Sequence, residues 1–242
     1  MVEFSRYRPA AGDLNWDGSV NARRIVGEIY RMGRREWLTA RGWEEMRHSG
    51  VRRIIDLRNP GENRIRARDP QVPASAQAGI EILQLPLEEP DNARFAAVAR
   101  PYMNHPAMYR LVCEEFPDHL REVFSALGEN AGGVVLHCSA GRDRSGLVAS
   151  LLLELTGQAE RVLQHDELAT RGINEWHRVS GYRHPHETYQ EDAQLQRMVD
   201  SRARALEEFM AWLGSAETFL REIGVPEAIL RRLQFHAQTP QS

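Results

Sequence analysis

The segment between Gly133 and Leu155 constrains the fold more than any other part of the chain. It opens with a short apolar run, Gly-Val-Val-Leu-His at 133–137, which is typical of a strand buried on both faces of a sheet. A loop with two glycines follows, and an almost continuous apolar helix is expected over residues 147–155. A strand, a loop and a helix in this order indicate an α/β fold.

The rest of the N-terminal two-thirds supplies further strands and helices. We expect strands over Ile25–Tyr30, Val51–Leu57 and Ile80–Leu87. Thr39 is a suitable N-cap for a helix that ends at Gly50, and the helical stretch 108–127 is expected to break at Pro117. The charged stretch 58–69 is expected to be a solvated connection.

From residue 160 to the end, the sequence is helical in pattern apart from a break at 180–187. Strands separated by helices predict a central, mostly parallel sheet of about four or five strands, flanked by helices and followed by a helical C-terminal region. No repeat or sharp change in composition divides the chain. We therefore expect one domain over 1–242, with an α/β core over about 1–157 and a helical part over about 158–242.

Composition and charge narrow the classes of function. A net charge of −3 argues against a nucleic-acid binder held by bulk positive charge. No apolar run approaches the roughly 20 residues that span a bilayer, and the N-terminus lacks the apolar segment of a signal peptide. A soluble, cytoplasmic protein is expected, while secretion by another route stays open. Two cysteines, Cys113 and Cys138, are too few for a disulfide framework.

The loop after the apolar strand has residues suited to binding and transferring a phosphoryl group. It reads His137-Cys138-Ser139-Ala140-Gly141-Arg142-Asp143-Arg144-Ser145-Gly146. Successive N–H groups and a helix N-terminus suit an oxyanion, so residues 139–144 are the expected phosphate contacts. Such a positive field favours the Cys138 thiolate, which would be the nucleophile. Arg144 could bind two phosphate oxygens with its planar guanidinium.

Other positions of the loop support the same interpretation. Ser145 could donate a hydrogen bond to the thiolate sulfur as it departs, and Gly141 and Gly146 suit positions where a Cβ would obstruct. The alternative is a buried cysteine in an ordinary turn between a strand and a helix. The joint spacing of cysteine, glycine, arginine and serine favours catalysis over that alternative.

The loop resembles the HC-x5-R-S/T signature of the protein tyrosine phosphatase superfamily. Its form, HC-S-A-G-R-D-R-S-G, is similar to the HC-x-A-G-K-D-R-T-G loop of a bacterial family that includes the mycobacterial protein tyrosine phosphatase B. That family is described as acting on phosphotyrosine, phosphoserine/threonine and phosphoinositides. Residues 50–62 and 219–225 also resemble it. Arg142 replaces the family's lysine, and the family's N-terminal N-F-R-D element is not clear around residues 15–18.

The resemblance implies an acid that protonates the leaving oxygen, carried by a loop upstream of the nucleophile. The stretch 85–91 resembles the P-x-x-D loop of dual-specificity phosphatases and places Glu89 at the acidic position. Asp91 and Asp143 stay as alternatives. Asp143 could gain a proton beside a bound dianion, or it could cap the following helix. The resemblance gives His137 a supporting role, in which its ring holds the loop by hydrogen bonds to the backbone.

Several other residues are expected to be structural. Arg58 and Glu62 are spaced for an ion pair on one helical face, and Cys113 is expected in the core. Core or interhelical packing is also expected of Trp37, Trp43, Trp176 and Trp212. No compact metal motif is formed by His165, His177, His184 and His186.

Together with the resemblance, these observations predict a metal-independent phosphomonoester hydrolase of the protein tyrosine phosphatase type. It is expected to act, without a cofactor, on a phosphorylated protein or a phospholipid headgroup through a cysteinyl-phosphate, with dual-specificity or phosphoinositide activity left open. The substrate class and the oligomeric state stay open. Two alternatives are a pseudophosphatase that only binds phosphorylated ligands and a sulfurtransferase or arsenate reductase. The intact Cys138 and Arg144 argue against the first, and the serine directly after Arg144 argues against the second.

Overall fold

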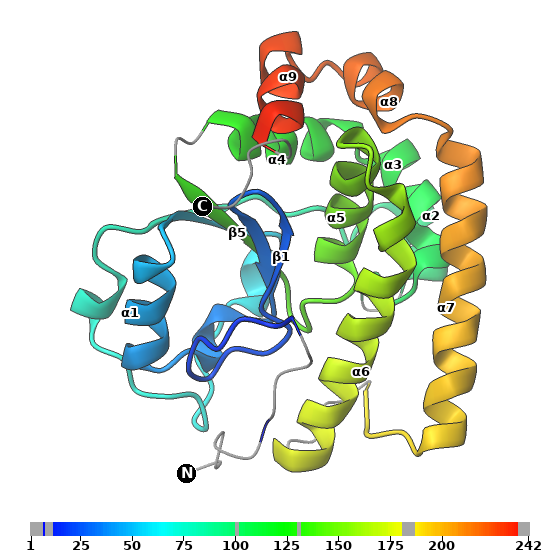
Figure 1. The fold of residues 1–242 in the computed structure, drawn as a ribbon. Coiled ribbons are helices and arrows are strands. Elements are labelled where there is room, and N and C mark those ends of the chain that lie inside the picture. The colour runs from blue at the N-terminus through cyan, green and yellow to red at the C-terminus, as the bar shows by residue number, and fades with distance from the viewer. Residues whose placement is uncertain (1–6, 8–11, 100–101, 130–131, 181–186, 237–242) are drawn as a thin grey trace.

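A five-stranded sheet forms the centre of the computed structural model, which describes residues 7, 12–99, 102–129, 132–180 and 187–236 (Figure 1). Its strands are β1 (Arg23–Val26), β2 (Ile29–Met32), β3 (Val51–Asp56), β4 (Glu81–Gln84) and β5 (Gly133–His137). They lie in the order β1-β2-β5-β3-β4, and only β1 and β2 pair in antiparallel fashion. The predicted mostly parallel sheet is confirmed.

Helices cover both faces of the sheet. The helix α1 (Ala40–His48) lies on one side, and the helices labelled α5, α6 and α7 lie on the other (Figure 1). The remaining helices are α2 (Ala93–Val98), α3 (Tyr109–Glu115), α4 (Pro117–Glu129), α5 (Arg144–Leu155), α6 (Val162–Ser180), α7 (Asp192–Leu213), α8 (Ala216–Glu222) and α9 (Glu227–His236). The break between α3 and α4 falls at Pro117, and Thr39 caps α1, as the sequence predicted.

The central strand β5 is buried on both faces, which explains its apolar sequence. Val134 and Leu136 pack into the larger apolar cluster. This cluster includes buried residues from each helix from α3 to α9. Val135 points to the opposite side and packs with Trp43 and Met46 of α1. The alternation of side chains along one strand therefore joins two cores, and it fixes the position of whatever follows β5.

The prediction of a single strand over 25–30 is wrong, because the chain turns back within it. β1 and β2 form an antiparallel hairpin, with Arg23 paired to Arg31. Gly27 lies at the turn with a φ of 48°, a left-handed conformation that glycine adopts without steric cost. Apolar residues on both sides of the turn made the segment resemble one continuous strand.

The prediction of a solvated connection over 58–69 is wrong at its two ends. Arg58 is fully buried and Asp69 is 7% exposed, because both belong to buried ion-pair networks. The expected break at 180–187 falls largely on residues 181–186, which lie outside the described residues.

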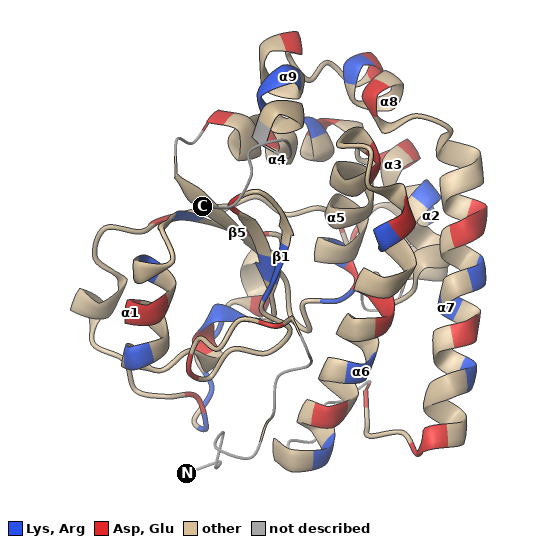
Figure 2. Cartoon of the chain, in the orientation of Figure 1, with Lys and Arg blue, Asp and Glu red and all other residues tan. Residues whose placement is uncertain are grey.

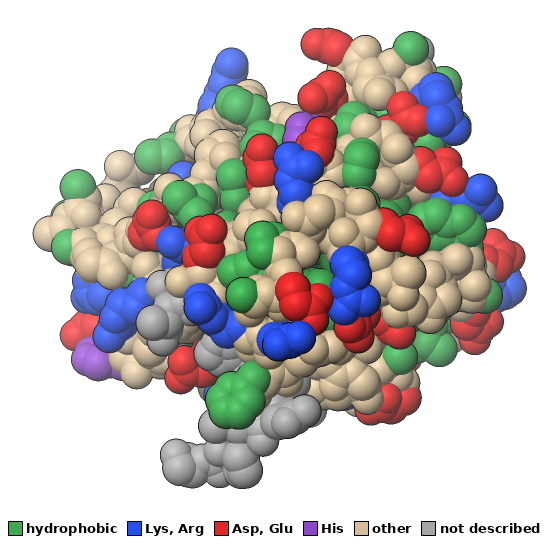
Figure 3. All heavy atoms as spheres, turned by 90° about the horizontal axis from the view of Figure 1, so that it is seen from above, with side chains coloured by type: hydrophobic (Ala, Val, Ile, Leu, Met, Phe, Trp, Pro, Cys, Tyr) green, Lys and Arg blue, Asp and Glu red, His purple; other side chains and the backbone are tan. Residues whose placement is uncertain are grey.

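The surface carries charges of both signs. Acidic and basic residues alternate along α7, and the face seen from above shows both signs among scattered apolar side chains (Figures 2 and 3). No helix in the described ranges is long and apolar enough to cross a membrane.

We expect the α/β core and the C-terminal helices to unfold together, because Leu233 of α9 is fully buried in the same cluster as the strands. Leu233→Ala should lower the free energy of unfolding by about 2–5 kcal/mol. The control Phe235→Ala, at a side chain that is 69% exposed, should change it by less than about 0.5 kcal/mol. Thermal unfolding followed by circular dichroism and calorimetry would show two separate transitions if the C-terminal helices formed an independent domain.

Candidate active site

The loop from Cys138 to Arg144 lies between β5 and α5, at the carboxyl end of the central strand. Cys138 is 2% exposed and lies in the wall of a pocket with Ser139, Ala140, Asp143 and Arg144. Of the loop residues expected to contact phosphate, Gly141 and Arg142 are not part of this pocket wall. Parallel strands end at the same edge of the sheet, so residues that follow β3 and β4 are brought to the same place.

The carbonyl groups of the loop are bound by donors from elsewhere in the chain. Five successive carbonyls accept hydrogen bonds, those of Ser139, Ala140, Gly141, Arg142 and Asp143. Their donors are, in order, the Arg34 N–H at 3.0 Å, Asn21 Nδ2 at 2.8 Å, Arg31 Nη2 at 3.0 and 2.7 Å, and the Tyr109 hydroxyl at 3.0 Å.

This arrangement orients the N–H groups of the loop. A peptide unit is planar and trans, so the N–H of each following residue points away from the bound carbonyl. Within the described part of the chain, the N–H groups of residues 139–143 donate to no protein acceptor. Gly141 has a φ of 67°, and a Cβ there would lie 2.4 Å from the Met32 carbonyl carbon. The loop is therefore shaped to present N–H groups to an anion.

Arg144 is the first residue of α5 and lies between two carboxylates. Its Nη1 and Nη2 contact the two oxygens of Glu62 at 2.5 and 2.8 Å, and Glu88 Oε1 lies 3.4 Å from Nη1. The Tyr102 ring lies 5.5 Å from the guanidinium carbon. Burial disfavours the charge of Arg144, but the Glu62 hydrogen bonds and the nearby carboxylates raise its pKa above the usual value. These contacts fix the position of the charged guanidinium beside Cys138.

The predicted pair between Arg58 and Glu62 is wrong. Arg58 binds Asp56 and Glu36, whereas Glu62 binds Arg144 and the Ser139 hydroxyl. The chain after β3 continues into a short 3₁₀ turn rather than an α-helix, so residues four apart do not share a helical face.

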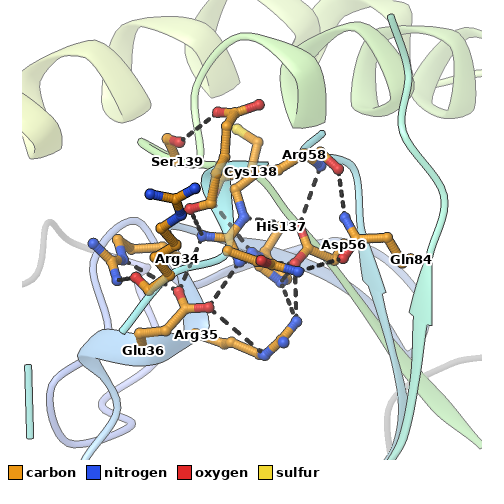
Figure 4. A network of polar contacts seen from close by, with 12 residues as sticks. Arg34, Arg35, Glu36, Asp56, Arg58, Gln84, His137, Cys138 and Ser139 are labelled. Atoms are coloured by element: carbon orange, nitrogen blue, oxygen red, sulfur yellow. Dashed lines mark hydrogen bonds and ion pairs between the residues drawn. The ribbon is translucent and has the colours of Figure 1, made fainter. Parts of the chain in front are cut away.

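His137 belongs to a buried polar network beneath the loop (Figure 4). Its Nδ1 lies 3.2 Å from the Cys138 carbonyl, which can only accept, and its Nε2 lies 3.4 Å from Arg35 Nη1. Burial lowers the pKa of His137, although Asp56 partly offsets this effect. Nδ1 can donate to the Cys138 carbonyl, while Nε2 lies between the Arg35 guanidinium and Asp56 Oδ2, which is 3.4 Å away. This geometry agrees with the supporting role that the resemblance implied.

The Ser145 hydroxyl lies next to the sulfur of Cys138. Its Oγ is 3.7 Å from Cys138 Sγ, and the residue is fully buried in the first turn of α5. The distance suits a weak hydrogen bond between a hydroxyl and a sulfur atom.

Asp143 lies in the pocket wall, and two arginines hold its carboxylate. Arg142 Nε lies 3.1 Å from Oδ2 and Arg202 Nη1 lies 2.9 Å from Oδ1. Burial raises the pKa of Asp143, but Arg142 and then Arg202 outweigh burial and hold the pKa below its usual value. Asp143 occupies the N-cap position of α5, but its side chain makes no capping hydrogen bond, so the structure does not support the alternative of a side-chain cap. Arg202, which also binds Asp166, ties the loop to α6 and α7.

The loop after β4 brings a different glutamate to the site from the one expected. The Glu89 side chain is 63% exposed and lies 3.4 Å from His119, and Asp91 is exposed as well. Neither belongs to the pocket wall. The preceding residue, Glu88, is 1% exposed and accepts the Met103 N–H beside Arg144. Burial raises the pKa of Glu88, and Arg144 partly offsets that increase.

Aromatic and apolar side chains also line the pocket. The Trp37 and Trp176 rings lie 4.2 Å apart, and Tyr102, Met103 and Ile173 also face the pocket. Trp37 and Trp176 therefore belong to the site as well as to the packing that was expected. Trp43 and Cys113 are buried as predicted, and Trp212, although 36% exposed, packs between helices, with its ring 6.5 Å from that of Phe219 on α8.

The histidines singled out from the sequence are dispersed. His165 is buried beside Arg161, and His177 lies at the pocket, while His184 and His186 fall outside the described residues. Within the described ranges, no group of His, Cys, Asp or Glu is arranged to hold a metal ion.

Four residues that hold the loop were missed in the sequence, namely Asn21, Arg31, Tyr109 and Arg202. They lie 34 to 119 residues away from the loop atoms that they bind. Asn21 is buried and has a φ of 57°. No local pattern marks these positions, because their partners become neighbours only after folding.

Comparison with known proteins agrees with this geometry. A "Putative tyrosine-protein phosphatase" of Cupriavidus necator is 30% identical over 158 residues, which are 62% of this chain and 56% of the relative. A tyrosine-protein phosphatase of Nostoc commune is 28% identical over 131 residues, 47% of this chain and 42% of the relative. This chain therefore spans about half the length of these curated relatives.

Among solved structures, the core catalytic domain of the PP-IP phosphatase SIW14 from S. cerevisiae aligns with 80% of this chain and 93% of its own length. The identity is 15% and the TM-score is 0.38. A family model described as the tyrosine phosphatase family matches residues 18–237. Because this match covers nearly the whole chain, the protein belongs to the tyrosine phosphatase family.

Proposed function

We propose that this chain hydrolyses phosphomonoesters through a phosphoryl group carried transiently on Cys138. The observation that supports this most strongly is the loop itself, in which bound carbonyls orient the N–H groups of residues 140–143, and these groups donate to no acceptor in the described part of the chain. Cys138 and the Arg144 guanidinium border the same pocket. Family membership supports the same chemistry.

The proposed reaction has two steps. The Cys138 thiolate attacks phosphorus, a P–S bond forms, and the P–O bond to the alcohol or phenol breaks as that oxygen takes a proton. Water then attacks phosphorus, the P–S bond breaks, and inorganic phosphate and the thiolate are released. Arg144 and the loop N–H groups bind the equatorial oxygens, where charge spreads in the transition state. Arg144 must share or exchange its contacts with Glu62 when phosphate binds.

We assign the proton transfers to Asp143, because it is the one of the three sequence candidates that reaches the pocket wall. A bound phosphate dianion would oppose the effect of Arg142 and Arg202 on this carboxylate and favour its protonated form. After the leaving group departs as the alcohol or phenol, the resulting carboxylate can accept a proton from the attacking water. Glu88 is the second candidate, because burial raises its pKa and it lies beside Arg144.

The pocket walls favour an aromatic phosphate as substrate. Trp37, Trp176 and Tyr102 offer ring faces and edges on which a phenyl group can pack, whereas the short side chain of a serine phosphate has no ring to pack on them. We infer that phosphotyrosine in a protein or peptide is the preferred substrate class. Phosphoserine/threonine and phosphoinositide headgroups are then the weaker substrates.

Hydrolysis of p-nitrophenyl phosphate, without added metal and with inhibition by vanadate, tests the proposed activity. Wild-type protein should turn over, and Cys138→Ser should keep less than about one per cent of the rate, because a hydroxyl is the weaker nucleophile at neutral pH. Vanadate should still bind the variant, as followed by calorimetry. Turnover that survives in Cys138→Ser would exclude this cysteine as the nucleophile. Binding without any wild-type turnover would indicate a pseudophosphatase.

A panel of phosphopeptides tests the substrate class. A phosphotyrosine peptide should be hydrolysed with higher kcat/KM than its phosphoserine counterpart. Trp176→Ala should lower kcat/KM for phosphotyrosine by roughly 3- to 10-fold, because one aromatic contact is worth about 0.5–1.5 kcal/mol, and it should affect phosphoserine less. Equal losses for both peptides would show that Trp176 only supports the loop.

The assignment of the acid predicts a dependence on the leaving group. Asp143→Asn should slow hydrolysis of alkyl phosphates by about 10²–10⁴-fold but affect p-nitrophenyl phosphate much less, because p-nitrophenolate leaves without a proton. Glu89→Gln, at an exposed side chain, is the matched control and should leave both rates unchanged. If Glu88→Gln alone produced the leaving-group dependence, the acid would be Glu88. If Glu89→Gln did so, the loop after β4 would have to move on binding.

A further inference from the structure

Arg31 is buried in the sheet and forms no ion pair with a carboxylate in the part of the chain that the structure describes. It lies on β2, opposite Leu136 of β5, and is 1% exposed. Within the described residues, the other buried arginines form ion pairs with carboxylates, namely Arg23, Arg34, Arg58, Arg142, Arg144 and Arg202. Burial of a cation without such a partner is costly, and it lowers the pKa of Arg31. The cost of burying this cation indicates that Arg31 has a function.

One nitrogen of Arg31, Nη2, lies near three acceptors and shares its two N–H protons among them. Nη2 lies 3.0 Å from the Gly141 carbonyl, 2.7 Å from the Arg142 carbonyl and 3.4 Å from Ser145 Oγ. The first two contacts fix the peptide planes that carry the N–H groups of Arg142 and Asp143. Arg31 thereby orients two of the N–H groups that would bind the phosphate.

The third contact bears on the hydroxyl of Ser145. A serine hydroxyl has one proton to donate, and its oxygen can accept from another group. Because Arg31 can only donate, its contact uses the lone pairs of Oγ and leaves the hydroxyl proton for another acceptor. Cys138 Sγ, at 3.7 Å, lies within reach of that proton.

We propose that Arg31 is a positioning residue for the breakdown of the cysteinyl-phosphate, a role that rests on the proposed function. When water attacks phosphorus, the P–S electron pair moves to sulfur and the water proton moves to the acting carboxylate. Ser145 stabilises the new thiolate through its hydroxyl proton, and Arg31 holds that hydroxyl in the orientation needed. Loss of Arg31 therefore slows this step more than the formation of the cysteinyl-phosphate.

Rapid mixing with p-nitrophenyl phosphate separates the two steps. Arg31→Met should give a burst of about one p-nitrophenolate per enzyme, followed by a steady rate lowered by about 10- to 100-fold, as Ser145→Ala should. In the double variant, the loss should be less than about threefold beyond Ser145→Ala alone, because both changes remove one interaction. Arg53→Met is the matched control. Arg53 lies on β3 and binds Glu81 and the Ala126 carbonyl, so it should show neither effect.

If the methionine variant fails to fold, Arg31→Lys provides a second test. The shorter lysine cation can still donate to the carbonyls, but it cannot reach all three acceptors. Absence of a burst in the folded variants, or losses that multiply in the double variant, would overturn the role of Arg31. Wild-type turnover in the same experiment separates the two ideas. If wild type turns over through Cys138 and the Arg31 variants show no burst, only this inference fails. If wild type is inactive, the proposed function fails first.

Discussion

Five carbonyl groups of the 138–144 loop are held by a main-chain amide, an asparagine, an arginine and a tyrosine. These donors come from the turn at Asn21, from β2 and the chain that follows it, and from α3, up to 119 residues away along the chain. Peptide planarity converts the bound carbonyls into an array of oriented N–H groups. The proposed anion site therefore exists only when the sheet and α3 have assembled around the loop.

Buried charge sets the second constraint on this site. Arg144 is neutralised by Glu62, and Asp143 is neutralised by Arg142 and Arg202. Removing one member of such a pair leaves an uncompensated buried charge, so these residues depend on one another. Arg202 also joins Asp143 to Asp166, which makes α6 and α7 part of the support for the loop. The helical C-terminal region thus supports the loop as well as the core.

The sequence allowed prediction of those features whose cause is local. The strand before Cys138, the glycines of its loop, the cap at Thr39 and the break at Pro117 each depend on neighbouring residues, and each was found as expected. The partners of Glu62 and Asn21 depend on contacts formed after folding, so spacing alone misassigned the first and missed the second. Glu88 and Glu89 are adjacent, and the sequence could not show which of them the loop turns inward.

Mass spectrometry of the quenched reaction tests the central claim most directly. Ser145→Ala protein, in which breakdown of the cysteinyl-phosphate is expected to be slow, should carry one phosphoryl group on the peptide that contains Cys138 when it is mixed with excess aryl phosphate and stopped in acid within milliseconds. The buried Cys113 should stay unmodified and serves as an internal control. The phosphorylated peptide should appear and decay at rates that account for turnover. Phosphate released without any adduct on Cys138, or an adduct on another residue formed at the same rate, would contradict the account.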